Sequence, residues 1–332
     1  MDSSFVPPNQ KSIGVVLCTY NGEQYLRQQL ESILAQTRPP EQILILDDCS
    51  SDSTVTIAKD FARIDDRIHL IQNKTNLGFV RNFEKGITLC EMDFIALCDQ
   101  DDIWLPNKLK RLAAELEENP NSGIAFCNAE YMLADGTRTG HVFFPLESKH
   151  TADPVLARNG LLEKKWCVQG NFILLDAEMK KLILPNPIAR SHAHDSWICL
   201  NAFFLRHPRY VSEPLSLYRL HNNMSSGTIT IALKGTPYAH KKKKWYHPYR
   251  LTKNLLRAFL SPFKHRKKIR DRQLLAHNTA TDLLSTLEQL LEKRQLLGLP
   301  ELSLEECLFF QKKRAEWTSI LSSSPDWINS QS

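Results

Sequence analysis

The sequence predicts an α/β fold whose mainly parallel sheet is flanked by helices on both faces. Two observations favour it. Over residues 12–127, short apolar runs rich in β-branched residues alternate with segments whose apolar residues recur at helical spacing. Such alternation is typical of parallel strands joined by helices. Polar or acidic residues also follow four consecutive strand-like runs, and ligands of such sheets bind beyond the carboxyl ends of the strands.

Each element of the first half follows from its own residues. Strands are expected at 12–18, 42–46, 67–72, 94–98 and 123–127, where short apolar runs end in turn or polar residues. Helices are expected over 26–36, around 55–61, over 79–90 and over 109–116. Pro106 is expected at the first position of the last helix, where its missing N–H costs nothing.

The second half has fewer regular elements. Residues 166–175 are expected to form a strand interrupted by Gly170 and Asn171, and a glycine inside a strand often marks a bulge or the close approach of a ligand. A further strand is expected at 211–221. Asp195 precedes a helical pattern with apolar residues at 197, 198, 200 and 203, so an N-cap is one role open to it.

Length and composition are typical of a cytoplasmic globular protein. The 332 residues are 42% hydrophobic and 24% charged, enough for one large domain with an appendage. No apolar run has the length of a membrane-spanning helix, and the first residues lack the basic start and apolar core of a signal peptide. Eight cysteines without a CxxC pair favour reduced thiols.

The stretch DFIALCDQDDIWL, residues 93–105, ends an apolar run in Asp99, Asp101 and Asp102. Buried carboxylates are costly without a positive neighbour. Mg²⁺ or Mn²⁺ would supply it, because these cations take oxygen ligands and share themselves with substrate phosphates. An acidic turn with capping aspartates is the alternative. GxGxxG and GxxxxGK[ST] are both absent, which argues against a dinucleotide-binding or P-loop site.

Four motifs occur in order over residues 12–109: VVLCTYNGEQYLRQQLESILAQT, ILILDDCSSDST, NLGFVRNFEKGI and FIALCDQDDIWLPNKL. Together they resemble the inverting glycosyltransferases of family 2, and most closely the bacterial rhamnosyltransferase-like branch. The resemblance implies a GT-A fold with a Rossmann-like sheet, a nucleotide-diphosphate sugar donor, and Mg²⁺ or Mn²⁺. The expected domains are a tail (1–11), a GT-A domain (12–227) with nucleotide-sugar (12–128) and acceptor (129–227) halves, and a basic helical C-terminal extension (228–332).

The resemblance also implies roles for residues at the four strand ends. Asp101 becomes the principal metal ligand, and Asp102 either supports the site or caps the next turn. Asp48 would accept a hydrogen bond from the imide N–H of uracil or thymine, which a carboxylate suits. The nucleotide- and donor-binding residues of this half are Tyr20, Asn21, Asp47, Asp48, Arg81 and Asp99, of which Asp99 contacts ribose or metal.

In the second half the resemblance places Gly170 and Asn171 on the donor-sugar and acceptor side. Asp195 becomes the general base, which takes the proton of the acceptor hydroxyl as that oxygen attacks the anomeric carbon opposite the leaving diphosphate. Many relatives carry Glu-Asp here, whereas this chain has His194 before Asp195, so the role of His194 stays open. Residues Arg219 and His221 belong to a segment that closes over the diphosphate, with His221 on the metal or a phosphate.

The C-terminal extension is strongly basic. Residues 241–272 hold 13 Lys and Arg against one acid, so the net charge of +5 leaves −7 for the rest of the chain. Basic clusters among aromatic residues at 241–268 suit an anionic membrane surface. A solvated basic helix is the alternative, and nucleic acid is disfavoured because no nucleic-acid-binding motif accompanies the charge. Helices are expected over 271–297 and after Ser303, packed on the core, on each other or on a second subunit.

The function expected from these patterns is that of a cytoplasmic, metal-dependent inverting glycosyltransferase, peripheral on the inner face of the cytoplasmic membrane if the basic segment binds lipid. The donor is a dTDP- or UDP-sugar, with dTDP-rhamnose suggested by the branch. The acceptor is a hydroxyl of a glycan or lipid-linked oligosaccharide in surface polysaccharide synthesis. Two rivals are a non-catalytic protein that binds nucleotide sugars or glycans, and a sugar nucleotidyltransferase, which would release pyrophosphate.

Overall fold

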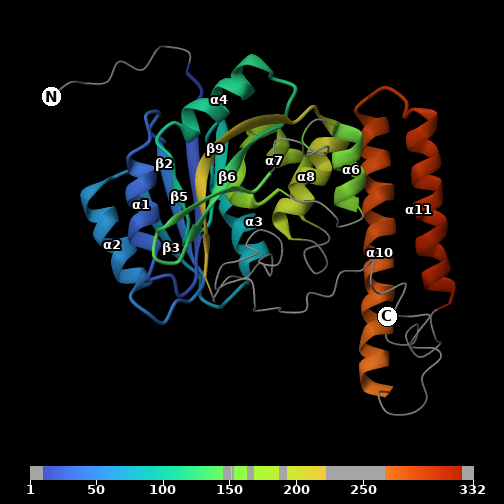
Figure 1. The fold of residues 1–332 in the computed structure, drawn as a ribbon, viewed down its shortest axis with the longest axis horizontal. Coiled ribbons are helices and arrows are strands. Elements are labelled where there is room, and N and C mark those ends of the chain that lie inside the picture. The colour runs from blue at the N-terminus through green and yellow to red at the C-terminus, as the bar shows by residue number, and fades with distance from the viewer. Residues whose placement is uncertain are drawn as a thin grey trace.

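The computed structural model describes residues 10–144, 151, 153–162, 168–186, 193–221 and 266–323. Within these ranges the chain forms a curved sheet with helices packed around it and a pair of long helices at one end (Figure 1). This arrangement confirms the predicted α/β fold class and its helical C-terminal extension.

The first four strands are parallel to one another and lie in the order β3-β2-β1-β4. They are β1 (Ile13–Thr19), β2 (Gln42–Asp47), β3 (Ile68–Gln72) and β4 (Phe94–Cys98). The helices α1 (Leu26–Leu34), α2 (Thr54–Ile64) and α3 (Phe79–Leu89) connect them. Every residue of β1 is buried, which is the reason for its unbroken apolar sequence.

The second half continues the sheet with mixed strand directions. Its strands are β5 (Ile103–Trp104), β6 (Ile124–Leu133), β7 (Arg138–Val142), β8 (Ile173–Asp176) and β9 (Arg209–Leu220). β8 is antiparallel to both β4 and β6, and β6 is parallel to β9. β5 pairs with the other edge of β9, and β7 pairs with β6. β8 thus lies beside the first residues of β4, and β9 lies beside β5, which follows the acidic turn after β4.

Two local predictions are wrong. Gly170–Phe172 forms a 3₁₀ turn, η1, at the predicted interruption, and within the described part of the expected strand, residues 168–175, β8 begins only at Ile173. Helix α4 (Lys108–Glu118) begins after the N-cap Asn107, so Pro106 lies outside it. The reason is that the Pro106 carbonyl accepts a hydrogen bond from the Thr37 N–H (2.9 Å), which ties this residue to the chain that follows α1.

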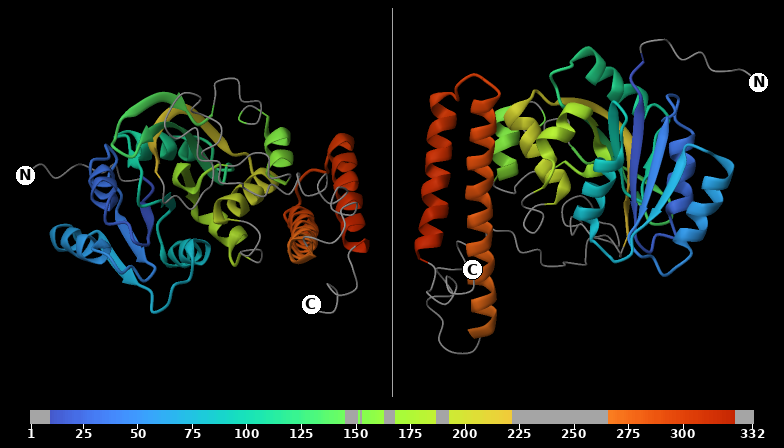
Figure 2. Two further views of the ribbon diagram at one scale, coloured as in Figure 1. Left: turned by 60° about the horizontal axis from the view of Figure 1, so that its bottom comes forward. Right: turned by 180° about the vertical axis from the view of Figure 1, so that it is seen from behind.

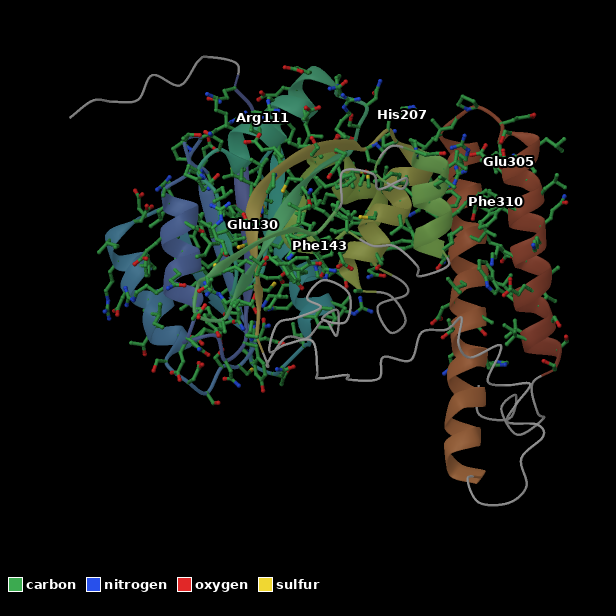
Figure 3. The ribbon with its side chains drawn as sticks, in the orientation of Figure 1. Arg111, Glu130, Phe143, His207, Glu305 and Phe310 are labelled. Atoms are coloured by element: carbon green, nitrogen blue, oxygen red, sulfur yellow. The ribbon has the colours of Figure 1, made fainter. Side chains whose placement is uncertain are left out.

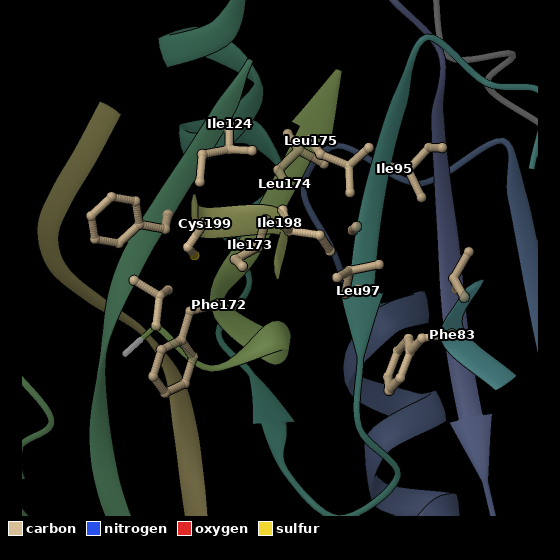
Figure 4. Close-up of a cluster of buried hydrophobic side chains, with 14 of the residues drawn as sticks. Phe83, Ile95, Leu97, Ile124, Phe172, Ile173, Leu174, Leu175, Ile198 and Cys199 are labelled. Carbon is tan, nitrogen blue, oxygen red and sulfur yellow. The ribbon is translucent and has the colours of Figure 1, made fainter. Parts of the chain in front are cut away.

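One apolar core joins the two halves. Side chains from β4, β6 and β8 meet those of helix α8 (His194–Leu205), as Figure 4 shows for Leu97, Ile124, Leu174 and Ile198. Nearly all residues of α8 are buried, because α6 (Pro154–Leu162), α7 (Ala177–Ile183) and the C-terminal helices pack around it. The predicted general base Asp195 therefore lies on a rigidly held helix.

Helices α10 (Arg266–Leu296) and α11 (Leu304–Ser322) lie side by side at the end of the molecule opposite α2 (Figures 1 and 2). The predicted capping box of Ser303 and Glu306 is present. Glu306 pairs with the buried Arg158 of α6, and the Phe310 ring, labelled in Figure 3, stacks on Phe204 of α8 at 5.4 Å. Of the arrangements expected, the described helices thus adopt packing on the core and on each other.

The basic segment is largely outside the described residues, which resume at 266, so the predicted membrane contact of 241–268 stays a prediction. In the part of the chain that the structure describes, no helix has the length and apolar character needed to cross a membrane.

Candidate active site

The acidic turn after β4 is tied to the end of β1 by its second residue, Gln100. The Gln100 Oε1 accepts a hydrogen bond from the Tyr20 N–H (2.9 Å), and its Nε2 donates to the Tyr20 carbonyl (3.0 Å). A Cβ on Gly22 would lie 2.1 Å from this Oε1, so glycine at 22 lets the amide reach the backbone. No role was expected for Gln100 from its sequence position, yet it holds the motif in place.

Asp101 and His221 lie together although 120 residues separate them: His221 Nε2 is 2.9 Å from Asp101 Oδ2. Arg219 supports the acidic turn after β4 from the interior of the protein, because its Nε donates to the Asp101 carbonyl (2.7 Å). Its other guanidinium nitrogens donate to the Ala134 carbonyl and the Gln28 side chain. Arg219 is only 2% exposed. The structure therefore places it beneath the acidic turn, where it supports Asp101.

Asp102 is buried, and both of its carboxylate oxygens have partners. Oδ1 accepts from the Arg219 N–H (2.8 Å), and Oδ2 accepts from Asn171 Nδ2 (2.7 Å). Burial and the charges of Asp101 and Asp99 raise the pKa of Asp102. Of the two roles predicted for Asp102, this geometry favours support of the site. Asn171 was predicted to lie on the substrate side of the site. Its side chain is instead fully buried, where it supports Asp102 from the interior of the protein.

Lys108 is a member of this buried layer that was not expected from the sequence. Its side chain is fully buried, and Nζ donates to the Asn171 carbonyl (2.5 Å) and to Ser216 Oγ (2.8 Å). Nζ also lies 4.0 Å from the centre of the Trp104 ring. A lysine in the first turn of a helix opposes the helix dipole. That misplaced charge, six residues after Asp102, was the available signal.

The carboxylates of Asp99 and Asp195 interact across the site. The pKa of Asp99 is raised to about 7 by burial, then by the charges of Asp101 and Asp195, and the charge of Lys108 only partly opposes this. Two segments from different halves, the turn after β4 and the start of α8, thus deliver acids to one place. Negative charge in excess of nearby cations makes this edge of the sheet attractive to a cation.

Asp195 occupies the first turn of α8, after the N-cap Ala193, so the N-cap role is not the one observed. Burial raises its pKa to about 6, although hydrogen bonds from Ser196 and from the backbone of Gly170 favour the carboxylate. A carboxylate with such a pKa suits proton transfer near neutral pH. The helix N-terminus beside it also favours its charged form.

His194 is buried and packs on α3. Its ring stacks on Phe83 with centroids 4.0 Å apart and meets Phe79 edge-on. Burial lowers the pKa of His194 to about 3, so the imidazole is neutral. Neither ring nitrogen has a hydrogen-bond partner among the described residues. A Cβ placed on Gly170 would lie 2.6 Å from His194 Nε2, which explains the need for glycine there.

The remaining predicted residues belong to the loops after β1, β2 and β3. Asn21 Oδ1 accepts from the Ser51 N–H (2.8 Å), which joins the first two loops. Asp47 accepts from Thr19 and Ser50. Asp48 is 3% exposed and accepts from the N–H groups of Leu77 and Gly78 and from Asn73 Nδ2 (2.7–2.8 Å). These acids hold the loops together, and their predicted contacts with a nucleobase stay predictions.

Arg81 lies apart from the acidic cluster. Its half-exposed side chain pairs with Glu84 on the next turn of α3 and reaches the Asn186 carbonyl (3.4 Å). Tyr20 is 51% exposed beside Gln100, a position from which its ring can meet a ligand. The structure thus joins Asp101 and His221 directly and brings Asp99 within electrostatic reach of Asp101 and Asp195. Asn171 and Arg219 support the acidic turn from the interior of the protein.

A Gly170→Ala variant is expected to lose about 10- to 100-fold in activity, since small displacements of a catalytic group carry costs of this order. The added methyl would meet the His194 imidazole, which the stacked Phe83 ring prevents from moving away. The turn must then shift and withdraw its hydrogen bond from Asp195. Steady-state kinetics would measure the loss.

The control for this prediction is His194→Ala, alone and combined with Gly170→Ala. Removal of the imidazole leaves room for the methyl group, so the double variant should recover most of the activity lost by Gly170→Ala. Additive losses in the double variant would contradict the steric explanation.

Comparisons with known proteins identify the family of this chain. The family model "Glycosyl transferase family 2" matches residues 14–174. An uncharacterized glycosyltransferase of Haemophilus influenzae is 34% identical over 224 residues, which are 64% of this chain and 67% of that protein. The putative teichuronic acid biosynthesis glycosyltransferase TuaG of Bacillus subtilis is 27% identical over 236 residues, 71% of this chain and 89% of TuaG.

Among solved structures, residues 1–349 of S. aureus TarS in complex with UDP-GlcNAc share the fold. The TM-score is 0.51 at 15% identity, with 96% of this chain and 83% of that chain covered. The names of these relatives do not single out the rhamnosyltransferase-like branch, which stays a prediction. The family model, the Haemophilus relative and the fold agree, and the chain is therefore a glycosyltransferase that belongs to family 2.

Proposed function

We propose that this glycosyltransferase moves a sugar from a nucleotide-diphosphate donor to a hydroxyl of a glycan or lipid-linked acceptor, with inversion and with a divalent metal. The observation that carries the proposal is the acidic cluster of Asp99, Asp101 and Asp195 at the carboxyl edge of the sheet. A general base and a cation-attracting turn within electrostatic reach of each other are the two groups that in-line displacement at the anomeric carbon needs.

The negative net charge of the site favours the binding of a cation. Four carboxylates (Asp99, Asp101, Asp102 and Asp195) face two buried cations, Lys108 and Arg219. A divalent ion would bring these charges to balance and would let Asp99 ionise, which burial and its acidic neighbours now oppose.

The ligand set also fits Mg²⁺ or Mn²⁺. Asp101 Oδ2 and His221 Nε2 are 2.9 Å apart, and neighbouring ligands of an octahedral ion with bonds of about 2.1 Å are separated by roughly 3 Å. Among the described residues no three His, Cys, Asp or Glu side chains form a complete metal cage. Mg²⁺ does not require one, because it commonly takes one or two carboxylates and completes its shell with water and substrate phosphates.

In the proposed mechanism Asp101 and His221 would hold the metal, with Asp99 beside them. When bound, the metal neutralises the charge that develops on the leaving diphosphate. Asp195 takes the proton of the acceptor hydroxyl as its oxygen attacks. Asp102 and Arg219 keep the acidic turn in place from below, while Tyr20, Asn21, Asp47, Asp48 and Arg81 form the proposed nucleotide side.

The substrate classes draw on the relatives. TarS was solved with UDP-GlcNAc and TuaG is named for teichuronic acid biosynthesis, which supports a nucleotide-diphosphate sugar such as a UDP-sugar as donor and surface polysaccharide as the product. The dTDP-rhamnose donor rests on likeness to one branch. The same proposal includes binding of the enzyme to the inner face of the cytoplasmic membrane through the basic residues of 241–268.

A screen of UDP-, dTDP- and GDP-sugars with Mn²⁺ or Mg²⁺ tests the proposal. At least one donor should yield its nucleoside diphosphate in a reaction that EDTA stops. Release of pyrophosphate from a nucleoside triphosphate would favour the nucleotidyltransferase instead, and donor binding without turnover would favour the non-catalytic binding protein. Absence of both binding and turnover with every donor would overturn the function.

A further inference from the structure

Asn171 is the junction of a buried hydrogen-bond network under the site. Its Oδ1 accepts from Trp104 Nε1 (2.6 Å), its Nδ2 donates to Asp102 Oδ2 (2.7 Å), and its carbonyl accepts from Lys108 Nζ (2.5 Å). The side chain is fully buried. An amide whose donor and acceptor are both engaged in opposite directions fixes the position of the turn that carries it.

One arm of the network reaches the proposed metal ligand. Asp102, which Asn171 holds through Oδ2, accepts from the Arg219 N–H through Oδ1 (2.8 Å). The Arg219 guanidinium in turn holds the Asp101 carbonyl (2.7 Å). Hydrogen bonds through Asp102 and Arg219 therefore connect Asn171 to the backbone of Asp101.

The other arm reaches the proposed base. Gly170, the residue before Asn171, makes a backbone hydrogen bond to the Asp195 carboxylate. Gly170 also packs against the His194 ring, so the turn is held to α8 on two sides. Residues 170 and 171 thus lie between the acidic turn after β4 and helix α8, which carries Asp195.

Lys108 stabilises the turn at residues 170–172, although the burial of its ammonium group is itself unfavourable. Its ammonium is fully buried, and the hydrogen-bond acceptors that it contacts, the Asn171 carbonyl and Ser216 Oγ, are neutral. Burial of a charge without a directly bonded opposite charge is unfavourable. The neighbouring acids and the Trp104 ring at 4.0 Å offset part of that cost. A charge-assisted hydrogen bond to the carbonyl is stronger than a neutral one would be.

We propose that Asn171 and Lys108 are positioning residues that together fix the separation between Asp101 and Asp195, and so between the leaving diphosphate and the attacking hydroxyl. The inference rests on the proposed function. An in-line displacement requires the base and the metal on opposite sides of the anomeric carbon at a set distance, so slack in this turn lowers the rate of the chemical step while donor binding survives.

Asn171→Ser and Lys108→Met test the inference. Each should lower kcat by about 100-fold, the cost of roughly 1 Å of misplacement, and change the donor KM at saturating Mn²⁺ by less than about threefold. Trp104→Phe is a milder change, since it removes one hydrogen bond to Asn171 and keeps an aromatic ring under Lys108; an intermediate loss of kcat is expected. Trp104→Phe tests the inference if the Asn171 and Lys108 variants do not fold.

Asn128→Ser is the matched control. Asn128 is also a buried amide of this sheet, and its side chain bonds the backbone of Ala129 and Phe144 without reaching the acidic cluster. It should lose thermal stability as the Asn171 variant does, with kcat unchanged. The NMR signal of the Trp104 indole N–H, assigned by Trp104→Phe, should move in Asn171→Ser and stay in place in Asn128→Ser.

The outcomes separate this inference from the proposed function. If the wild type turns over a donor and the Asn171, Lys108 and Trp104 variants keep its kcat, the positioning role is wrong and the function stands. If these variants lose donor binding as strongly as kcat, the network belongs to donor binding and the positioning role is also wrong. A wild type inactive with every donor overturns both.

Discussion

An Asp195→Asn variant is expected to bind the donor like the wild type and to lose about 10²- to 10⁴-fold in kcat, the usual contribution of a general base. Asparagine has nearly the same shape, and its oxygen can still accept the hydrogen bonds that Ser196 and Gly170 make with Asp195. What it lacks is the capacity to take a proton from the acceptor. Donor titration calorimetry and kinetics of transfer would measure the two effects separately.

The same residue sets the expected pH dependence. Because burial raises the pKa of Asp195 to about 6, the base is protonated and inactive at lower pH. The kcat of the wild type should therefore fall about tenfold per pH unit below pH 6, and the residual activity of Asp195→Asn should show no such step. A wild-type profile that stays level down to pH 4.5 would contradict the assignment.

Asp195→Asn should also make the protein more stable at pH 8. A carboxyl whose pKa is about 6 when folded, against an ordinary 3.8, favours folding in its protonated form, and this contribution disappears as the pH rises through 6. Removal of the buried charge should then raise the free energy of unfolding by about 3 kcal/mol at pH 8, on the basis of roughly 1.4 kcal/mol per pKa unit.

Unfolding in denaturant at pH 8 and pH 4 would measure this gain. At pH 4 the wild-type carboxyl is already protonated in the folded state, so little or no difference between the two proteins should remain. An equal gain at both pH values would point to repacking instead of charge removal.

The sequence was sufficient to predict where acidic residues gather, because parallel strands end at one edge of the sheet. Asp47, Asp99 and the loops around them follow strands whose apolar runs are unmistakable, and the motifs put the acids at their ends. Asp195 was predicted as the general base through family resemblance alone. Its residue pattern also allowed an N-cap, and only the fold brings it within electrostatic reach of Asp99.

The sequence did not predict which of the site residues are buried beneath the protein surface. Asn171 and Arg219 were expected to meet the donor, yet both are buried under the acidic turn. The reason lies in the second half of the sheet. β8 pairs with the first residues of β4, and β9 pairs with β5 and β6. Hydrophobic periodicity does not determine such pairings. Lys108 was missed for a related reason, since a polar residue on a helix is usually exposed.

An Asp101→Ala variant is expected to weaken Mn²⁺-dependent binding of the donor by at least about 100-fold, because loss of a group that merely orients a metal ligand typically costs 10- to 100-fold. The change removes one of the two side chains that suit the metal and leaves His221 Nε2 without its carboxylate partner at 2.9 Å. Calorimetric titration of the donor with and without Mn²⁺ would measure the loss.

The contrast between Asp101→Ala and Asp195→Asn decides the roles. Donor affinity in the absence of metal should be alike in both variants and the wild type, since neither change reaches the loops proposed to hold the nucleotide. With Mn²⁺ present, affinity should rise for the wild type and Asp195→Asn, and stay low for Asp101→Ala. Equal losses of metal-dependent donor binding in the two variants would contradict the division of this acidic cluster into a metal ligand on the β4 turn and a base on α8.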